Sequence, residues 1–178
     1  DYETELSIPL RMKNVPENVV LTSDLPPVLK VGVKDRGTVL VNYLLGQTLY
    51  PVTLDFAEYS DKGSHVRIPT SSLNKRLASQ LNQSTKLSTI KPDTLELIYT
   101  RGQGKKVPVK VRGEVKAERQ HYISEIVYSP DSVMVYAPKD ILDTITAAYT
   151  EELYIEEISD TTRHRAKLLP VKGAKFTP

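Results

Sequence analysis

The sequence predicts a mainly β fold with a minor helical share (α+β), built from two tandem repeats. Many short segments alternate apolar and polar residues, and proline-marked patterns recur about 100 residues apart. Alternation with a period of two is typical of strands that bury one face. Recurrence of the pattern at a fixed spacing indicates that one structural unit is used twice.

Two proline signatures define the repeat. An apolar residue followed by proline stands at Pro9, Pro69, Pro108 and Pro170, and a proline that leads an alternating strand stands at Pro26, Pro92 and Pro130. Proline cannot donate a ladder hydrogen bond, so it is expected at strand starts and edges. These spacings predict repeat 1 at residues 1–104 and repeat 2 at 105–178. The order of signatures calls for a further proline-led strand beyond Pro170, so we expect repeat 2 to be truncated at its C-terminal end.

In repeat 1, alternation predicts strands at 7–13 and 19–21 and a proline-led strand through Leu29, Val31 and Val33. Residues 38–45 fit either a short helix or a bent apolar turn, ended by Gly46. A further strand is expected over 48–56, interrupted by Pro51.

The clearest helix is predicted over residues 70–82. Leucines at 73, 77 and 81 recur four residues apart and form one apolar stripe, with Ser71 or Ser72 as the cap. A strand follows at 92–99, and the glycines at 102 and 104 predict a turn.

Repeat 2 is expected to begin with a strand over 106–112, in which valines occupy one face and basic residues and proline the other. One strand or a pair of strands is expected over 115–127. A short helical segment follows at 140–148, with Ile141, Leu142 and Ile145 as its apolar face. Strands at 153–158 and 166–171 complete the chain.

The composition bears on which classes of protein this chain can belong to. The 178 residues include 24 basic and 22 acidic side chains, a net charge of +2 that does not suggest a nucleic-acid footprint. There is no cysteine, which fits either a cytosolic or an extracytoplasmic protein. No apolar run approaches the roughly 18 residues that span a bilayer. The chain begins at Asp1 without methionine, and we interpret it as a piece of a longer protein.

The ordered set of segments resembles the YbbR family of bacterial envelope proteins. It comprises VLKVGV, VLVNYLL and VTLDF in the first repeat, and VPVKVRG, SPDSVMVYAP, ILDTI and YTEELYIEE in the second. The resemblance implies a membrane helix before the repeats and a location outside the cytoplasm. It also implies a fold like the C-terminal β domain of a large-subunit ribosomal protein. The best understood members regulate a membrane diadenylate cyclase. One departure is that Gly32 in repeat 1 is matched by Tyr136 in repeat 2.

No catalytic, cofactor or metal site is predicted. The histidines at 65, 121 and 164 lack the close spacing of metal ligands. The sequence GQGKK at 102–106 hints at a phosphate loop, but it leads into a strand, so a hairpin turn is the preferred interpretation. Acidic residues could form a weak calcium site, but we interpret them as a solvated strand face; they are Glu151, Glu152, Glu156, Glu157 and Asp160. No serine lies in a nucleophile elbow.

A basic strip near the junction of the repeats is the one candidate contact surface. It comprises Lys105, Lys106, Lys110 and Arg112, with Lys116 and Arg119 further on. Such a strip suits an acidic partner or anionic lipid headgroups. Lysines also protect edge strands against self-association, and this interpretation is preferred for the strip.

The functional hypothesis is a non-catalytic, extracytoplasmic interaction and regulatory module of a membrane-anchored protein. Its partner would be a protein at the membrane, for which the resemblance suggests a diadenylate cyclase. One alternative is an RNA-binding β domain, motivated by the basic strip and opposed by the near-neutral charge. Another is a passive envelope spacer in which tandem repeats only set distance.

Overall fold

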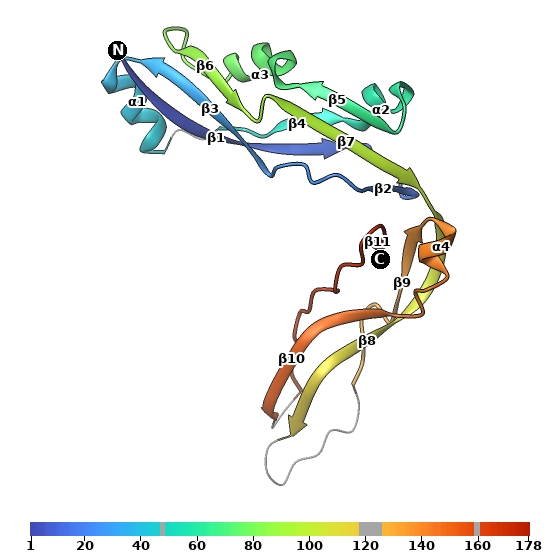
Figure 1. The fold of residues 1–178 in the computed structure, drawn as a ribbon. Helices are drawn as coiled ribbons and strands as arrows, with labels where there is room; N and C mark the ends of the chain where they lie inside the picture. The colour runs from blue at the N-terminus through green and yellow to red at the C-terminus, as the bar shows by residue number, and fades with distance from the viewer. Residues whose placement is uncertain (47–48, 118–125, 159–160) are drawn as a thin grey trace. The chain divides into compact units, whose positions relative to one another are not determined.

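The computed structural model describes residues 1–46, 49–117, 126–158 and 161–178, and the side chains of 156–158 are not described. The chain divides into two compact units (Figure 1). Unit 1 comprises Asp1–Pro16 and Leu21–Tyr99, and unit 2 comprises Glu17–Val20 and Thr100–Pro178. The assignment of Glu17–Val20 to unit 2 was not expected from the sequence. Among the described helices, none is long and apolar enough to cross a membrane.

Unit 1 is built on a four-stranded sheet of order β4-β1-β3-β6 (Figure 1). Its strands are β1 (Tyr2–Lys13), β3 (Val28–Asp35), β4 (Val52–Asp55) and β6 (Lys86–Lys91). β1 pairs antiparallel with β3 and parallel with β4, and β6 pairs antiparallel with β3.

A three-stranded sheet of order β2-β7-β5 and several short helices complete this part of the chain. The strands are β2 (Val19–Leu21), β5 (His65–Pro69) and β7 (Thr94–Arg101). The helices are α1 (Gly37–Leu44), α2 (Phe56–Tyr59) and α3 (Asn74–Ala78), with 3-10 turns η1 (Ser60–Lys62) and η2 (Thr70–Leu73). The segment at 38–45 is therefore a helix, and Gly46 after it has the positive φ of 131° that favours glycine.

The alternating residues of these strands form the core of unit 1. β1 buries Leu6 and Ile8, and β3 buries Leu29, Val31 and Val33, as their period of two predicts. Other strands and helices contribute Leu54, Phe56, Leu77, Leu95 and Leu97, each at most 2% exposed. Each fully buried aliphatic or aromatic side chain stabilises the fold by about 1.5–3 kcal/mol relative to exposure.

Unit 2 contains a second four-stranded sheet, of order β10-β8-β9-β11. Its strands are β8 (Gln103–Ala117), β9 (Ser132–Ala137), β10 (Ala148–Ile158) and β11 (Lys175–Thr177), and its helix is α4 (Lys139–Leu142). The buried cluster lies on one face of this sheet and against α4. It consists of Val107, Val133, Val135, Ala137, Leu142, Ile145 and Ala148.

The two units repeat one topology, as the proline spacing predicts. β8 pairs antiparallel with β9 and parallel with β10, as β1 does with β3 and β4. The register matches as well, because the Leu10 amide donates to the Pro27 carbonyl and the Val109 amide to the Asp131 carbonyl, both at 2.9 Å. β11 takes the place next to β9 that β6 takes next to β3.

Two predicted elements differ from the structure. The helix expected over 70–82 is a 3-10 turn, η2, followed by only five residues of α3, and no serine side chain caps either element. The amide and hydroxyl of Thr70 both bond to the Asp93 carbonyl, at 2.9 Å each, and these bonds fix the first turn instead.

The prediction of a hairpin turn at 102–104 is wrong, because β7 and β8 are not paired and the chain between them stays extended. Gly102 is required because a Cβ there would lie 2.6 Å from the Ala137 amide nitrogen.

Other differences concern short elements. β5, α2, β6 and β11 were not predicted, because each has only three to six residues. The strand expected at 166–171 is reduced to an isolated bridge between Thr150 and Leu168. The strand at 48–56 forms only after Pro51, as β4. Of the segment at 115–127, residues 118–125 lie outside the described residues.

A buried carboxylate ties the end of β3 to the chain before β6. Asp35 is 4% exposed and accepts hydrogen bonds from the hydroxyls of Thr85 at 2.6 Å and Ser84 at 2.7 Å. The Tyr43 hydroxyl of α1 bonds to Thr85 at 2.8 Å and accepts from the Asn82 amide at 2.8 Å. The bonds from Thr85, then Ser84, lower the pKa of Asp35 below its usual value. The network therefore stabilises unit 1 when Asp35 is ionised.

We expect the Asp35 network to make unit 1 acid-sensitive. A carboxyl whose pKa is lowered by folding stabilises the folded state above its unfolded pKa of about 3.9, and this stabilisation is lost as the pH falls through the folded value. Urea unfolding midpoints measured below about pH 4 should fall with pH in the native chain. They should fall less steeply in Asp35→Asn, which is also less stable at neutral pH. A residual slope is expected because the pKa of Asp55 is also lowered, by its bond from Asn14. Equal slopes for both proteins would contradict this account.

Candidate functional site

The predicted basic strip lies on β8, which pairs with β9 through residues 103–108 and with β10 from Val109 onward. Protection of an edge, the interpretation preferred from the sequence, stays a prediction. Successive residues of a strand point to opposite faces. Lys106, Lys110 and Arg112 are exposed on the outer face of the sheet, whereas Lys105 is partly buried on the face that also bears Val107. The structure therefore brings three of the four predicted residues together and separates Lys105 from them.

Lys105 has a structural role within unit 2. Its ammonium donates to the carbonyl oxygens of Leu142 at 3.3 Å and Ile145 at 2.7 Å, at and just beyond the end of α4. The last carbonyls of a helix lack intrahelical partners, and a cation near them is favourable. Lys105 thus holds α4 on the sheet and is withdrawn from the outer surface.

A bulge in β10 adds aromatic residues to the basic face. Tyr149 is opposite Lys110 and Glu152 is opposite Arg112, so β10 has one residue more than β8 over this interval. The extra residue turns inward at Thr150, which is 4% exposed and whose hydroxyl accepts from the Arg112 amide at 3.1 Å. In a regular strand Tyr149 and Glu152 would point to opposite faces. The bulge therefore places both beside the basic residues.

The resulting surface carries three cations, one carboxylate (Glu152) and two exposed tyrosines. Tyr149 is 41% exposed and Tyr154 is 68% exposed. The Tyr154 hydroxyl donates to Glu152 at 2.9 Å, and this bond, with the charge of Glu152, raises the pKa of Tyr154. We call Lys106, Lys110 and Arg112 with Tyr149 and Tyr154 the basic face of unit 2. Within the described residues, the three cations form no salt bridge.

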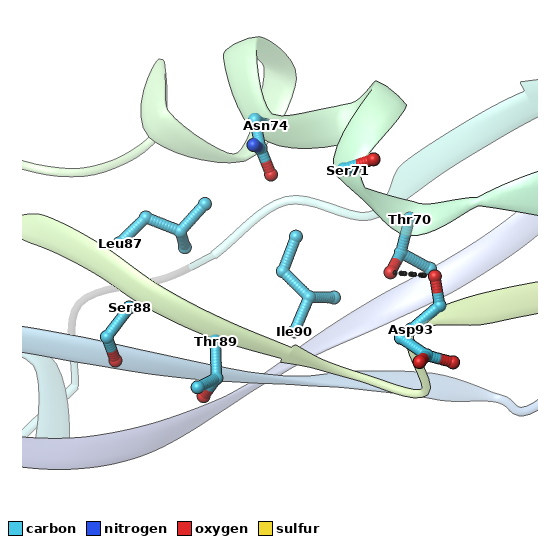
Figure 2. Close-up of a pocket in the computed structure, with 8 residues that line it drawn as sticks. All are labelled: Thr70, Ser71, Asn74, Leu87, Ser88, Thr89, Ile90 and Asp93. Atoms are coloured by element: carbon cyan, nitrogen blue, oxygen red, sulfur yellow. Dashed lines mark hydrogen bonds between the residues drawn. The ribbon is translucent and has the colours of Figure 1, made fainter.

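A second candidate site is a hollow beside β6 in unit 1. Thr89 is opposite Gly32, but Leu87 is opposite Val33, so Ser88 is an extra residue in β6. The bulge puts Leu87 and Ile90 on one side of β6, while Ser88 and Thr89 point away (Figure 2). Gly32 makes room for this bulge, because a Cβ there would collide with the Thr89 hydroxyl and lie 2.9 Å from that of Ser88.

The hollow lies between β6 and the turn formed by η2 and α3 (Figure 2). Its volume is about 310 Å³. Leu87 and Ile90 form the apolar side, and polar groups surround them, namely Thr70, Ser71, Asn74, Ser88, Thr89 and Asp93. Thr70 is held by its bonds to the carbonyls of Pro92 and Asp93. The hollow therefore combines a small apolar floor with hydrogen-bonding groups, of which only Asp93 carries a charge.

Comparison with known proteins identifies the second unit. Residues 107–177 match the family model described as YbbR-like protein. They form a YbbR-like domain. The chain also resembles the crystal structure of a YbbR-like protein from Streptococcus pneumoniae TIGR4, with a TM-score of 0.60 and 15% identity over 98% of this chain and 89% of that one. At this identity the likeness shows a shared fold, and it extends to unit 1. No curated protein matches the sequence.

The family resemblance and the β-rich fold are thus confirmed. The YbbR-like domain contains the basic face except Lys106, which directly precedes the first matched residue. The likeness to a ribosomal β domain stays a prediction.

Of the remaining sequence candidates, Glu152 lies beside Arg112 of the basic face. His65 is exposed on β5 near Glu96, at 3.7 Å, and His164 is exposed, while His121 lies outside the described residues. In the described part of the chain, no group of three or more acidic or histidine side chains could hold a metal ion. Of the acidic cluster, Glu151 and Glu152 are exposed on β10 of the YbbR-like domain; the side chains of Glu156, Glu157 and Asp160 are not described, and neither is Arg119. Lys116 is paired with Glu114 at 3.3 Å.

Sequence reasoning missed the hollow because it missed β6. One signal was available, namely Gly32 where the YbbR-like domain has Tyr136. A glycine inside an alternating strand indicates a bulge or a close backbone approach. Tyr136 pairs with Lys175 of β11, where no bulge occurs. The glycine therefore marked the strand that distinguishes the two units.

Two neighbouring lysines provide a direct check on the orientation of β8. Lys105→Ala should destabilise unit 2 by about 1–2 kcal/mol, because it removes charged hydrogen bonds to carbonyls at the end of α4. Lys106→Ala should change stability by less than about 0.5 kcal/mol, because the side chain is exposed and forms no such bond. Urea unfolding of each variant gives both values. Equal effects would show that the two side chains are not on opposite faces.

A double-mutant cycle checks the role of Gly32. Gly32→Ala should destabilise the chain by about 1–3 kcal/mol, because the new methyl overlaps the Thr89 hydroxyl. Thr89→Ala alone should have a small effect, and the double variant should recover most of the loss. Additive effects in thermal or urea unfolding would contradict the proposed contact.

Proposed function

We propose that this chain is a protein-interaction module without catalytic activity, and that the basic face of unit 2 binds an acidic protein partner. The proposal is carried by one observation. Lys106, Lys110 and Arg112 share one exposed face of a central strand and have no salt-bridge partner among the described residues.

The tyrosines suit this role. Tyr149 and Tyr154 offer rigid, amphipathic contact area, and tyrosine and arginine are enriched where protein interfaces gain most affinity. The basic face rests on the paired strands β8 and β10, so the spacing of its side chains is set by their register. A partner with carboxylates at matching spacing would gain charge-assisted hydrogen bonds and faster association.

The setting we propose is extracytoplasmic, in a membrane-anchored protein. It is supported by the YbbR-like domain together with the resemblance of the whole chain to that family. A membrane diadenylate cyclase is the partner that the resemblance suggests, and regulation of such an enzyme is the finer form of the proposal. A passive spacer would need no exposed cationic surface.

Single-stranded RNA is a second candidate ligand for the same face. Exposed tyrosines beside cations are the groups on which bases stack and with which phosphates pair. The net charge of +2 opposes this function, because most nucleic-acid-binding domains carry a larger excess of basic residues.

The proposed function can be tested by charge reversal and capture. The full-length protein would be crosslinked in its own membranes and its partners identified by mass. Lys106, Lys110 and Arg112 would be changed together to Glu, and a control would carry the same change at Lys62, Lys75 and Lys172, which are exposed elsewhere. We expect the amount of captured partner to fall at least about tenfold in the first variant and to stay unchanged in the control.

The identity of the captured partner then decides the finer claims. Capture of a diadenylate cyclase that depends on the basic face would support the regulator. Capture of a different envelope protein that also depends on the basic face would support the interaction module and exclude the cyclase as its partner. Equal capture by both variants would contradict the proposed role of the basic face in binding. RNA affinity that falls steeply with salt and is lost in the first variant would favour the second candidate.

A further inference from the structure

β6 is an edge strand whose two sides carry different kinds of residue. Among the described residues it pairs only with β3, so its other edge is available to backbone donors and acceptors from outside. The helical turn of η2 and α3 lies over the side of β6 that bears Leu87 and Ile90 (Figure 2). The hollow between them opens beside this edge.

The inner side of β6 could accept one apolar side chain. Leu87 and Ile90 are only half-buried, and the hollow of about 310 Å³ next to them has no side chain that fills it. That volume is at the lower end for ligand sites, which suits a single aliphatic group rather than a large molecule. The surrounding Ser71 and Asn74 are neutral and exposed, whereas the exposed carboxylate of Asp93 disfavours an anion inside the hollow.

The outer side of β6 brings two cations together. Lys86 is directly opposite Lys34 of β3, and both are exposed. Like charges directly opposite each other destabilise a strand pair. Within the described residues neither lysine forms a salt bridge. At the other end of β6, Lys91 is compensated by Glu5 at 3.9 Å. Glu3 of β1 is opposite Lys34 on its other side, and its carboxylate accepts from the Ser88 hydroxyl at 2.8 Å. The cation that an added anionic group would meet is therefore Lys86, on the unpaired edge.

The same lysines argue against a second copy as the occupant. If two β6 strands paired antiparallel, Lys86 of one copy would approach Lys91 of the other, and parallel pairing would bring like lysines together. Lysine on an edge strand is a common means of preventing such self-association. Charge complementarity thus favours a different protein that supplies an acidic residue.

We propose that β6 binds an extended segment of a partner protein, which pairs with its edge as an additional strand. An aliphatic side chain of that segment enters the hollow at Leu87 and Ile90, and an adjacent acidic residue meets Lys86. Neighbouring residues of a strand point to opposite faces, so the two requirements fall on consecutive residues of the partner. Backbone bonds supply affinity and the side chains supply specificity, as in other cases of strand addition.

This inference is independent of the basic face. It uses unit 1, in which Gly32 permits the bulge that turns Leu87 and Ile90 to one side. Unit 2 has Tyr136 and an unbulged β11 at the matching place, so the same site is not expected there. Charge reversal on β8 should leave it unaffected.

The test uses a phage-displayed library of random heptapeptides selected against the immobilised chain. We expect enrichment of an aliphatic residue next to an acidic one within an alternating segment. The most enriched peptide, labelled with fluorescein, would then be titrated by anisotropy against the native chain and three variants.

Lys86→Glu should weaken this peptide at least about fivefold, and a peptide with Lys in place of its acidic residue should bind this variant better than the native chain. Ser71→Trp, an exposed position that would fill the hollow, should abolish binding. The matched control Lys172→Glu, with the same charge change on unit 2, should bind as the native chain does. Absence of the aliphatic–acidic pair, or binding indifferent to Lys86→Glu and Ser71→Trp, would overturn the proposal.

Discussion

The pairing of each long strand with the proline-led strand that follows it determines the rest of each unit. One backbone bond recurs in both pairs, from the Leu10 amide to the Pro27 carbonyl and from the Val109 amide to the Asp131 carbonyl. A shift of one residue in this register would turn every buried valine and leucine outward. Because the parallel strand on one side and the antiparallel strand on the other add to this pair, the same four-stranded order appears twice.

On this common frame, two bulges decide which side chains share a surface. The one at Thr150 aligns Tyr149 and Glu152 with the cations of β8, and the one at Ser88 aligns Leu87 with Ile90. Each bulge has a local cause. A buried hydroxyl accepts the Arg112 amide at the first, and the missing side chain of Gly32 makes room at the second. A bulge re-aims side chains without altering the topology. The two units therefore share a fold but present different surfaces.

These causes explain what the sequence could reveal. Strict alternation identified β1, β3, β7 and β9, because a half-buried strand imposes a period of two. The helix at 70–82 was overextended, because three leucines four apart fit a longer helix while Thr70 and its carbonyl partners fix only a short turn. β6 escaped notice because its bulge breaks the alternation by which strands are recognised. The basic strip was found, and the alternation of the observed strand places Lys105 on the valine face, opposite to Lys106.

The divergence between the units has a consequence for how a tandem repeat protein evolves contact surfaces. Core positions must keep their alternation in both copies, since each apolar side chain there stabilises the fold by several times the thermal energy. The outer faces and edges are free of that constraint. Gly32 and Tyr136 occupy matching positions, yet the glycine admits a bulge and a hollow, whereas Tyr136 bonds through its hydroxyl to Glu17 at 3.2 Å within unit 2. A single position on the outer face thus decides whether the neighbouring strand forms a potential binding edge or a regular pair.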